Sequence, residues 1–175
     1  MITVYKLLSV FLEYPDKQMV EEWDEIRALV NNDKSLSTDD RQVLTDFIDW
    51  ASQMSITRFQ AKYVDTFDLH SRHSLYLTYH LFDEQDRDRG PALIELSELY
   101  KATGFEIADG ELPDYLPLIL EYVATMDDED SARKFLQQTT QAIDIIATNL
   151  EEANSPYAPL LRLIERHGTL ATIAA

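Results

Sequence analysis

Residues 131–150 read SARKFLQQTTQAIDIIATNL, and their apolar side chains recur at every third or fourth position. This spacing is typical of an α-helix that buries one face and exposes the other. Ser131 stands just before the repeat, where its hydroxyl can accept a backbone N–H and begin the helix. The stripe consists of Ala132, Phe135, Leu136, Thr139, Ala142, Ile143, Ile146, Ala147 and Leu150. We therefore predict a long helix that lies against the core.

The same helical spacing extends in both directions along the chain, and no segment shows a convincing strand period. There are only 4 glycines, and all of them fall between helical segments or at their ends. Further helices are predicted over residues 4–13, 19–30, 38–51, 57–67, 74–82, 91–103, 115–126 and 155–168. The sequence thus predicts an all-α fold, a single-domain bundle of about eight to nine helices spanning residues 1–175. We expect the tail at 169–175 to be loose.

Several boundaries carry local signals. Ser37 or Thr38 can cap the helix that follows, and Thr57 can cap the next one. Residues 74–82 are nearly uncharged, which favours a short buried helix. Two irregular stretches are expected, a charged loop over 83–90 and the longer segment 105–114.

The charge balance restricts the possible partners. The chain has 15 basic and 32 acidic residues, a net charge of −17. Such a surface repels nucleic-acid phosphates and anionic lipid, whereas a basic peptide would be steered towards it. The alternative is that the acidity only keeps the protein soluble.

The absence of cysteine excludes disulfides and thiolate chemistry. The start of the chain lacks the basic and apolar regions of a signal peptide, and no segment approaches the roughly 18 apolar residues of a membrane span. We therefore expect a cytoplasmic protein that does not insert into the membrane.

One cluster could carry metal chemistry. Asp65, Asp68, His70 and His73 lie close in sequence, and His80 follows. Carboxylates and imidazoles suit a hydrolytic metal site. The spacings of helical metal enzymes are missing, however, so we favour a polar loop between helices.

A calcium loop is also disfavoured. Glu84, Asp86, Asp88 and Glu95 have suitable spacing, but Arg89 occupies the position where the loop requires glycine. The chain also lacks a nucleophile elbow and a glycine-rich phosphate loop. We assign no catalytic residue, no metal ligand and no cofactor.

Large apolar groups gather in the central third of the chain. Each of them is more often a core residue than a binding residue. A groove lined by such groups and rimmed by Asp and Glu would accept an amphipathic basic helix. The group comprises Tyr63, Phe67, Tyr76, Tyr79, Phe82, Tyr115 and Tyr122.

These segments resemble the TorD/DmsD/NarJ family of molybdoenzyme-specific chaperones. YVDTFD at 63–68 resembles the first hallmark, Tyr/Phe-x-x-Leu-Phe, and ELPDYLP at 111–117 resembles the second, Glu-x-Pro-Asp-His. SLYLTYHLF at 74–82 with DRDRG at 86–90, and LEYP at 12–15, resemble the nitrate reductase delta-subunit branch. Thr66 replaces the leucine of the first hallmark and Tyr115 the histidine of the second, so no role of an imidazole is carried over.

The resemblance implies an all-helical cytoplasmic chaperone, not an enzyme. Its expected partner is the catalytic (alpha) subunit of respiratory nitrate reductase, including its N-terminal peptide. The chaperone would hold the apo-subunit until molybdenum cofactor insertion, before membrane docking. Contact with cofactor delivery proteins is left open. The alternatives are a chaperone for an S- or N-oxide reductase, a generic helical interaction module, or the metal-dependent hydrolase.

We place the client groove near segments 63–67, 79–89 and 111–115, which predicts that truncating Phe67 weakens client binding more than truncating Phe135. For the acidic and basic members at 86–89, a purely structural role remains an equal alternative. Asp114 could simply cap the central helix. The candidate client-binding residues are Tyr63, Phe67, Asp68, Tyr76, Tyr79, Phe82, Asp86, Arg87, Asp88, Arg89, Glu111, Pro113, Asp114, Tyr115 and Tyr122.

Overall fold

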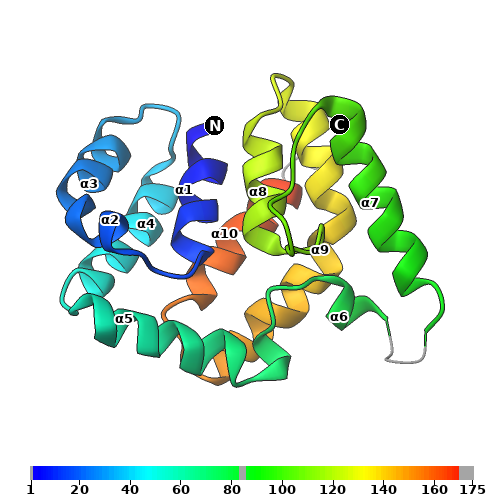
Figure 1. Ribbon diagram of the computed structural model, residues 1–175. Helices are drawn as coiled ribbons and strands as arrows, with labels where there is room; N and C mark the ends of the chain where they lie inside the picture. Colours follow the sequence, from blue (N-terminus) through cyan, green and yellow to red (C-terminus); the bar gives the residue numbers. More distant parts are fainter. Residues whose placement is uncertain (1, 83–85, 170–175) are drawn as a thin grey trace.

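The computed structural model describes residues 2–82 and 86–169, and the regular elements in these ranges are all helical (Figure 1). Of its ten α-helices, eight have eight or more residues, which confirms the prediction of an all-α bundle. The long helices are α1 (Ile2–Leu12), α3 (Trp23–Asn32), α4 (Thr38–Ala51), α5 (Ile56–Tyr63), α7 (Arg89–Thr103), α8 (Leu116–Ala124), α9 (Glu129–Glu152) and α10 (Ala158–Thr169). The short ones are α2 (Lys17–Glu21) and α6 (Thr78–Leu81).

Helix α9 forms the spine of the molecule. It packs along α10 and also contacts α6 and α8. The predicted stripe faces the core, although Phe135 and Thr139 at one end of it are only half-buried. The helix begins earlier than predicted: Asp128 is the cap, because its carboxylate accepts the backbone N–H groups of Asp130 and Ser131. Ser131 is therefore inside the helix and not its cap.

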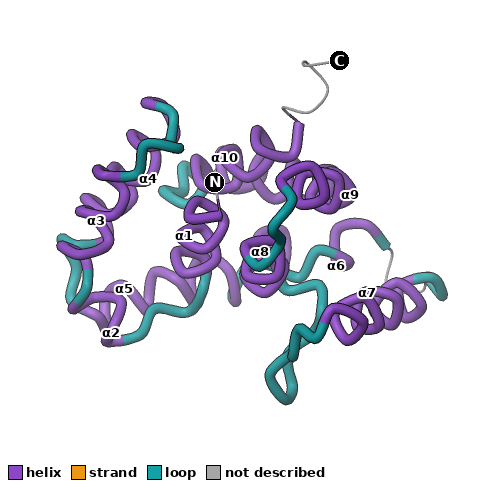
Figure 2. The backbone as a smooth tube through the Cα atoms, turned by 90° about the horizontal axis from the view of Figure 1, so that it is seen from above, coloured by secondary structure: helices purple, strands orange, loops and turns teal. Residues whose placement is uncertain are grey.

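The remaining helices lie on two sides of a central group. Helices α1, α8, α9 and α10 form the middle, with α2–α5 on one side and α6–α7 on the other (Figures 1 and 2). Helix α8 packs along α1 and is buried on most of its surface, as its apolar sequence predicts. Its Glu121 reaches the surface, where Lys6 lies 2.5 Å away.

Stacked aromatic rings join the α2–α5 side to the middle. The ring of Phe47 lies 5.0 Å from that of Phe11 and 5.2 Å from that of Tyr157, between centroids. Trp23 and Phe59 complete the group at 6.0 Å from each other. Such pairs contribute about 0.5–1.5 kcal/mol each beyond the area they bury. The N-terminal helices are therefore part of the main core.

Some predicted boundaries were wrong. Ser37 caps α4 as expected, but α5 is capped by Ser55, whose hydroxyl accepts the N–H of Arg58, and not by Thr57. The helix expected over 19–30 is interrupted at Glu22. Helix α10 begins at Ala158 and includes Thr169, so only residues 170–175 of the expected tail remain, and these lie outside the described residues.

The segment 74–82 is not the single buried helix that we predicted. Within it, only Thr78–Leu81 is helical, and residues 74–77 form an irregular segment that includes the isolated bridge at Tyr76. The reason is that Leu75 and Leu77 bond to the backbone of a distant segment: Leu116 N donates to Leu75 O at 2.8 Å, and Leu77 N to Asp114 O at 3.1 Å.

A buried polar contact ties α10 to α4. His167 Nε2 lies 3.2 Å from Asp40 Oδ2, and Arg166 pairs with the other carboxylate oxygen at 3.1 Å. The Tyr5 ring of α1 contacts the imidazole edge to face at 5.8 Å, and Arg133 of α9 is the other nearby cation. Burial lowers the pKa of His167 below its ordinary value, although Asp40 acts in the opposite direction.

This contact predicts acid sensitivity. A histidine whose folded-state pKa is lowered takes up a proton more readily when unfolded, so it destabilises the fold as the pH drops below about 6.5. Replacing it by His167→Gln should flatten the pH dependence of the unfolding free energy between pH 6.5 and 5, by up to about 1.4 kcal/mol per pH unit. Urea unfolding of both proteins across this range measures the difference. A steeper dependence in the variant would contradict the lowered pKa.

Candidate functional site

Two segments about forty residues apart meet as a short strap beside α8. Tyr76 and Tyr115 form an isolated antiparallel bridge, and their rings lie 5.1 Å apart. These segments are the ones that carry the family resemblance, 74–82 and 111–117. We call the paired residues 75–77 and 114–116 the strap.

A buried carboxylate holds the end of the strap. Asp114 is 1% exposed, and its Oδ2 accepts bonds from Thr78 N at 2.9 Å and from Thr78 Oγ1 at 2.6 Å. Arg89 Nε donates to the same Thr78 hydroxyl at 3.1 Å, which links the 86–89 segment to the strap. The expectation that Asp114 only caps α8 is wrong, because Tyr115 occupies the N-cap position.

Tyrosine hydroxyls fix the strap to the core. Tyr63 donates to Leu12 O at 2.9 Å, and its oxygen lies 3.0 Å from the hydroxyl of Tyr115. Tyr76 donates to Glu111 at 3.0 Å. Burial raises the pKa of Tyr63 and Tyr115, and burial together with Glu111 raises that of Tyr76 to about 12. All three side chains are therefore neutral hydrogen-bonding groups near pH 7.

Beside the strap lies a hollow of about 800 Å³ between α6, α7, α8 and α9. We call it the α7–α9 cavity. The apolar groups at its wall are Leu77, Leu81, Phe82, Ala92, Leu96, Leu99, Ile119, Tyr122, Met126 and Phe135. Its polar lining residues are Thr78, Glu95, Asp114, Ser131, Lys134, Gln138 and Thr139.

Two helix faces form the long walls of the cavity. On α7, Ala92, Glu95, Leu96 and Leu99 have the spacing i, i+3, i+4, i+7 of one helical face. The α9 wall has the same spacing from Ser131 to Thr139. Each wall runs about two helical turns, roughly 10 Å.

The predicted site residues fall into groups. Phe82, Asp114 and Tyr122 line the cavity. Tyr76 and Tyr115 belong to the strap, Glu111 bonds to Tyr76, and the carbonyl of Pro113 accepts the Tyr100 hydroxyl at 2.9 Å.

The other predicted residues lie away from the cavity. Tyr63 and Phe67 are 4% and 5% exposed in the core, where their ring centroids lie 4.9 Å apart with the planes inclined at 56°. Asp68, Tyr79, Asp86, Arg87 and Asp88 are exposed, and none of them lines the cavity. Arg89 is half-buried against Thr78.

Sequence reasoning missed most of the α7 and α9 walls. Phe135 was assigned to the core stripe of α9, yet it borders the cavity, whereas Phe67 is packed inside. The predicted difference in client binding between truncation of Phe67 and truncation of Phe135 stays a prediction, although the positions of the two rings favour the opposite order. A signal was present in α7, whose apolar residues surround the helix and leave Ile94 65% exposed. When a helix is apolar on more than one face, the core covers only one of these faces, and the other is left for a different contact.

The charge around the cavity is nearly balanced in the described residues. Its lining contains the acids Glu95 and Asp114 and the base Lys134. Asp83 and Glu84 follow Phe82 but lie outside the described residues. The sequence predicted a groove rimmed by Asp and Glu, but the described lining of this cavity has no such acidic rim.

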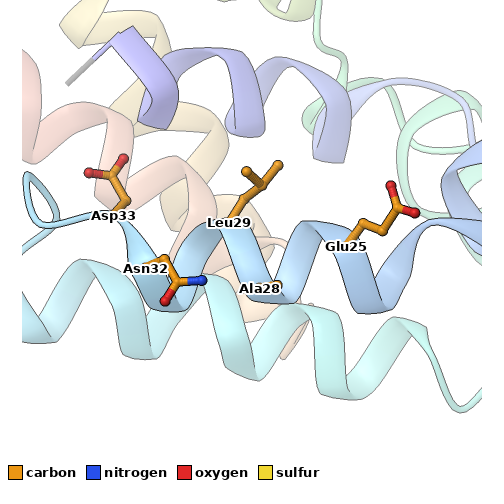
Figure 3. A pocket seen from close by; sticks show the side chains of 5 residues that line it. All are labelled: Glu25, Ala28, Leu29, Asn32 and Asp33. Atoms are coloured by element: carbon orange, nitrogen blue, oxygen red, sulfur yellow. The ribbon is translucent and has the colours of Figure 1, made fainter.

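A second hollow, of about 560 Å³, lies on α3 (Figure 3). Its lining residues are Glu25, Ala28, Leu29, Asn32 and Asp33, all from α3 or the residue that ends it. Leu29 is 59% exposed. Because a single helix supplies the whole lining, this hollow is a shallow surface and not a groove between elements.

The three histidines within residues 70–80 contact one another or the backbone. The rings of His70 and His73 lie 5.4 Å apart, and His73 Nδ1 lies 2.9 Å from Thr66 O. His80 Nε2 lies 2.8 Å from Ser74 O. Within residues 2–82 and 86–169, no three His, Asp or Glu side chains are grouped as metal ligands. In the same ranges, no helix is long and apolar enough to cross a membrane.

A solved structure shares the fold. A redox enzyme maturation protein from Archaeoglobus fulgidus superposes with a TM-score of 0.63, covering 95% of this chain and 92% of that one. The identity is 23%, so this likeness supports the fold alone.

Sequence comparisons identify relatives at higher identity. A Bacillus subtilis (strain 168) protein that bears the name of a nitrate reductase molybdenum cofactor assembly chaperone, NarJ, is 33% identical over 91% of this chain and 85% of its own length. The NarJ chaperone of Escherichia coli (strain K12) is 32% identical, and the aligned region covers 90% of this chain and 66% of that relative. The model of the nitrate reductase delta subunit family matches residues 33–162. The chain therefore belongs to the nitrate reductase delta subunit family.

Proposed function

We propose that this protein is a dedicated assembly chaperone for the catalytic subunit of respiratory nitrate reductase. It binds the apo-subunit, including the N-terminal segment, and holds it competent for molybdenum cofactor insertion before membrane docking. In this proposal it acts in the cytoplasm and catalyses no reaction. The support is its family and the names of the relatives in Bacillus subtilis and Escherichia coli, which are assembly chaperones.

The α7–α9 cavity is the observation that carries the client-binding part of the proposal. Its walls present two parallel series of side chains at helical spacing, and its lining is mainly apolar. An amphipathic helix laid into such a groove would insert side chains at i, i+3, i+4 and i+7. Of the residues predicted from sequence, Phe82, Asp114 and Tyr122 would contact this helix directly, and Tyr76, Tyr115 and Glu111 would hold the strap in place.

Apolar burial supplies most of the affinity. Each leucine-sized side chain transferred into the cavity contributes about 2 kcal/mol. Association costs at least about 4 kcal/mol, so several anchors are needed before binding becomes tight. A client segment with three or four apolar residues on one face meets this requirement.

Another client and further partners are compatible with this proposal. An S- or N-oxide reductase would be a client of the same kind, and the experiment below separates it from nitrate reductase by including its N-terminal peptide. Cofactor delivery proteins would be additional partners of the loaded chaperone.

Titration calorimetry tests the proposal. The N-terminal peptide of the cognate nitrate reductase catalytic subunit should bind with micromolar or lower Kd, at about −8 kcal/mol. A scrambled peptide of equal composition should bind at least about tenfold more weakly, because its apolar residues no longer share a helix face. Equal binding of both peptides would contradict recognition by shape, and tighter binding of the oxide reductase peptide would reassign the client.

The position of the groove predicts a difference between two matched leucines. Leu99 lines the α7–α9 cavity at 39% exposure, whereas Leu29 is on the α3 hollow at 59% (Figure 3). Because both are on the surface, neither substitution to alanine should unfold the protein. Leu99→Ala should weaken peptide binding about five- to tenfold through lost apolar burial, and Leu29→Ala less than about twofold. Equal losses, measured by the same calorimetry, would remove the cavity from the proposal.

A further inference from the structure

Asp114 uses only half of its carboxylate to hold the strap. Its Oδ2 accepts both bonds from Thr78, whereas its Oδ1 is buried and has no hydrogen-bond partner in the described structure. The side chain also belongs to the lining of the α7–α9 cavity. An unsatisfied carboxylate oxygen therefore belongs to a residue that lines a mainly apolar hollow.

Such an arrangement is costly unless a ligand completes it. A buried polar atom without a partner loses its hydration and gains nothing in return, and the loss is larger for a charged group. Native proteins leave few such atoms, and those that remain are often at sites of function. The missing partner must be a donor, because an ionised carboxylate only accepts hydrogen bonds.

The protein's own cations do not fill this position. Arg89 donates to the Thr78 hydroxyl through Nε, and among the described residues it makes no hydrogen bond to Asp114 Oδ1. Lys134 lines the same cavity, but it is exposed on α9 and no ion pair joins it to the carboxylate. Within the described residues, neither cation bonds to Oδ1, so this oxygen is open to a donor from a bound partner.

We infer that the cavity takes one lysine or arginine side chain of the client helix, which donates to Asp114 Oδ1 while its apolar neighbours contact the α7 and α9 walls. The long alkyl stem of either residue suits the mainly apolar lining, and its charged head meets the only buried carboxylate of the described lining. This inference rests on the proposed function. According to this inference, Asp114 makes the cavity selective: a client helix with one lysine or arginine among its apolar residues binds more tightly than a purely apolar helix.

The test is a set of client peptides in which each lysine or arginine in turn is replaced by norleucine, which keeps the stem and removes the charge. Each peptide is titrated against the wild-type protein, Asp114→Asn and Glu95→Gln. The asparagine keeps a carbonyl oxygen for Thr78, and Glu95 provides an exposed carboxylate of the same cavity as the matched control.

At one peptide position, norleucine should weaken binding to the wild-type protein by about 30-fold, as expected for loss of one partner of a buried charge pair. The same replacement should cost less than about threefold with Asp114→Asn, and about 30-fold again with Glu95→Gln. The pair should also persist in 0.5 M salt, since buried pairs are weakly screened.

The opposite results separate the inference from the proposed function. If no single replacement costs the wild-type protein more than about threefold, the inference is overturned, whether or not Asp114→Asn folds. The proposed function survives that result, because the native peptide still binds. If the native peptide itself does not bind, the proposed function fails and the inference fails with it.

Discussion

The bond between Asp114 and Thr78 determines the geometry on which the candidate site depends. It joins the start of α6 to the residue before the α8 cap, and it draws Arg89 at the start of α7 to the same point. Without it, the strap would be held only by a few backbone bonds and the tyrosine hydroxyls. Together with the apolar cluster of Tyr100, Leu118 and Tyr122, this bond ties the start of α7 to the strap at one end of the cavity. A residue that fixes the fold here also faces the site.

This double use explains why the resemblance and the cavity coincide only in part. The aromatic members of the first hallmark, Tyr63 and Phe67, are buried in the core. The Tyr63 hydroxyl contacts that of Tyr115 in the strap, and Phe67 packs against the Tyr63 ring. The segments that carry the resemblance therefore include residues that stabilise the strap as well as residues that line the cavity.

The sequence predicted the helices well because their signals are local. The stripe of α9 and the Ser37 cap depend on residues within a few positions of one another. The segment 74–82 failed because its backbone pairs with residues near Asp114, about forty positions away, and no periodicity shows such pairing. The walls of the cavity were missed for a related reason. Phe135 has the spacing of a core residue, and only the three-dimensional arrangement shows that the cavity separates it from α7.

The cavity also changes how the net charge of −17 should be understood. A general acidic surface attracts basic segments of any sequence and speeds their arrival, but it distinguishes poorly between them. The described lining of the cavity is nearly neutral, and one oxygen of its buried Asp114 carboxylate has no partner. In our proposal, steering and selection of the client therefore rest on different parts of the molecule. The acidic surface would supply long-range steering that salt weakens, whereas selection would depend on the shape of the cavity and on a buried acceptor that a correctly spaced cation can reach.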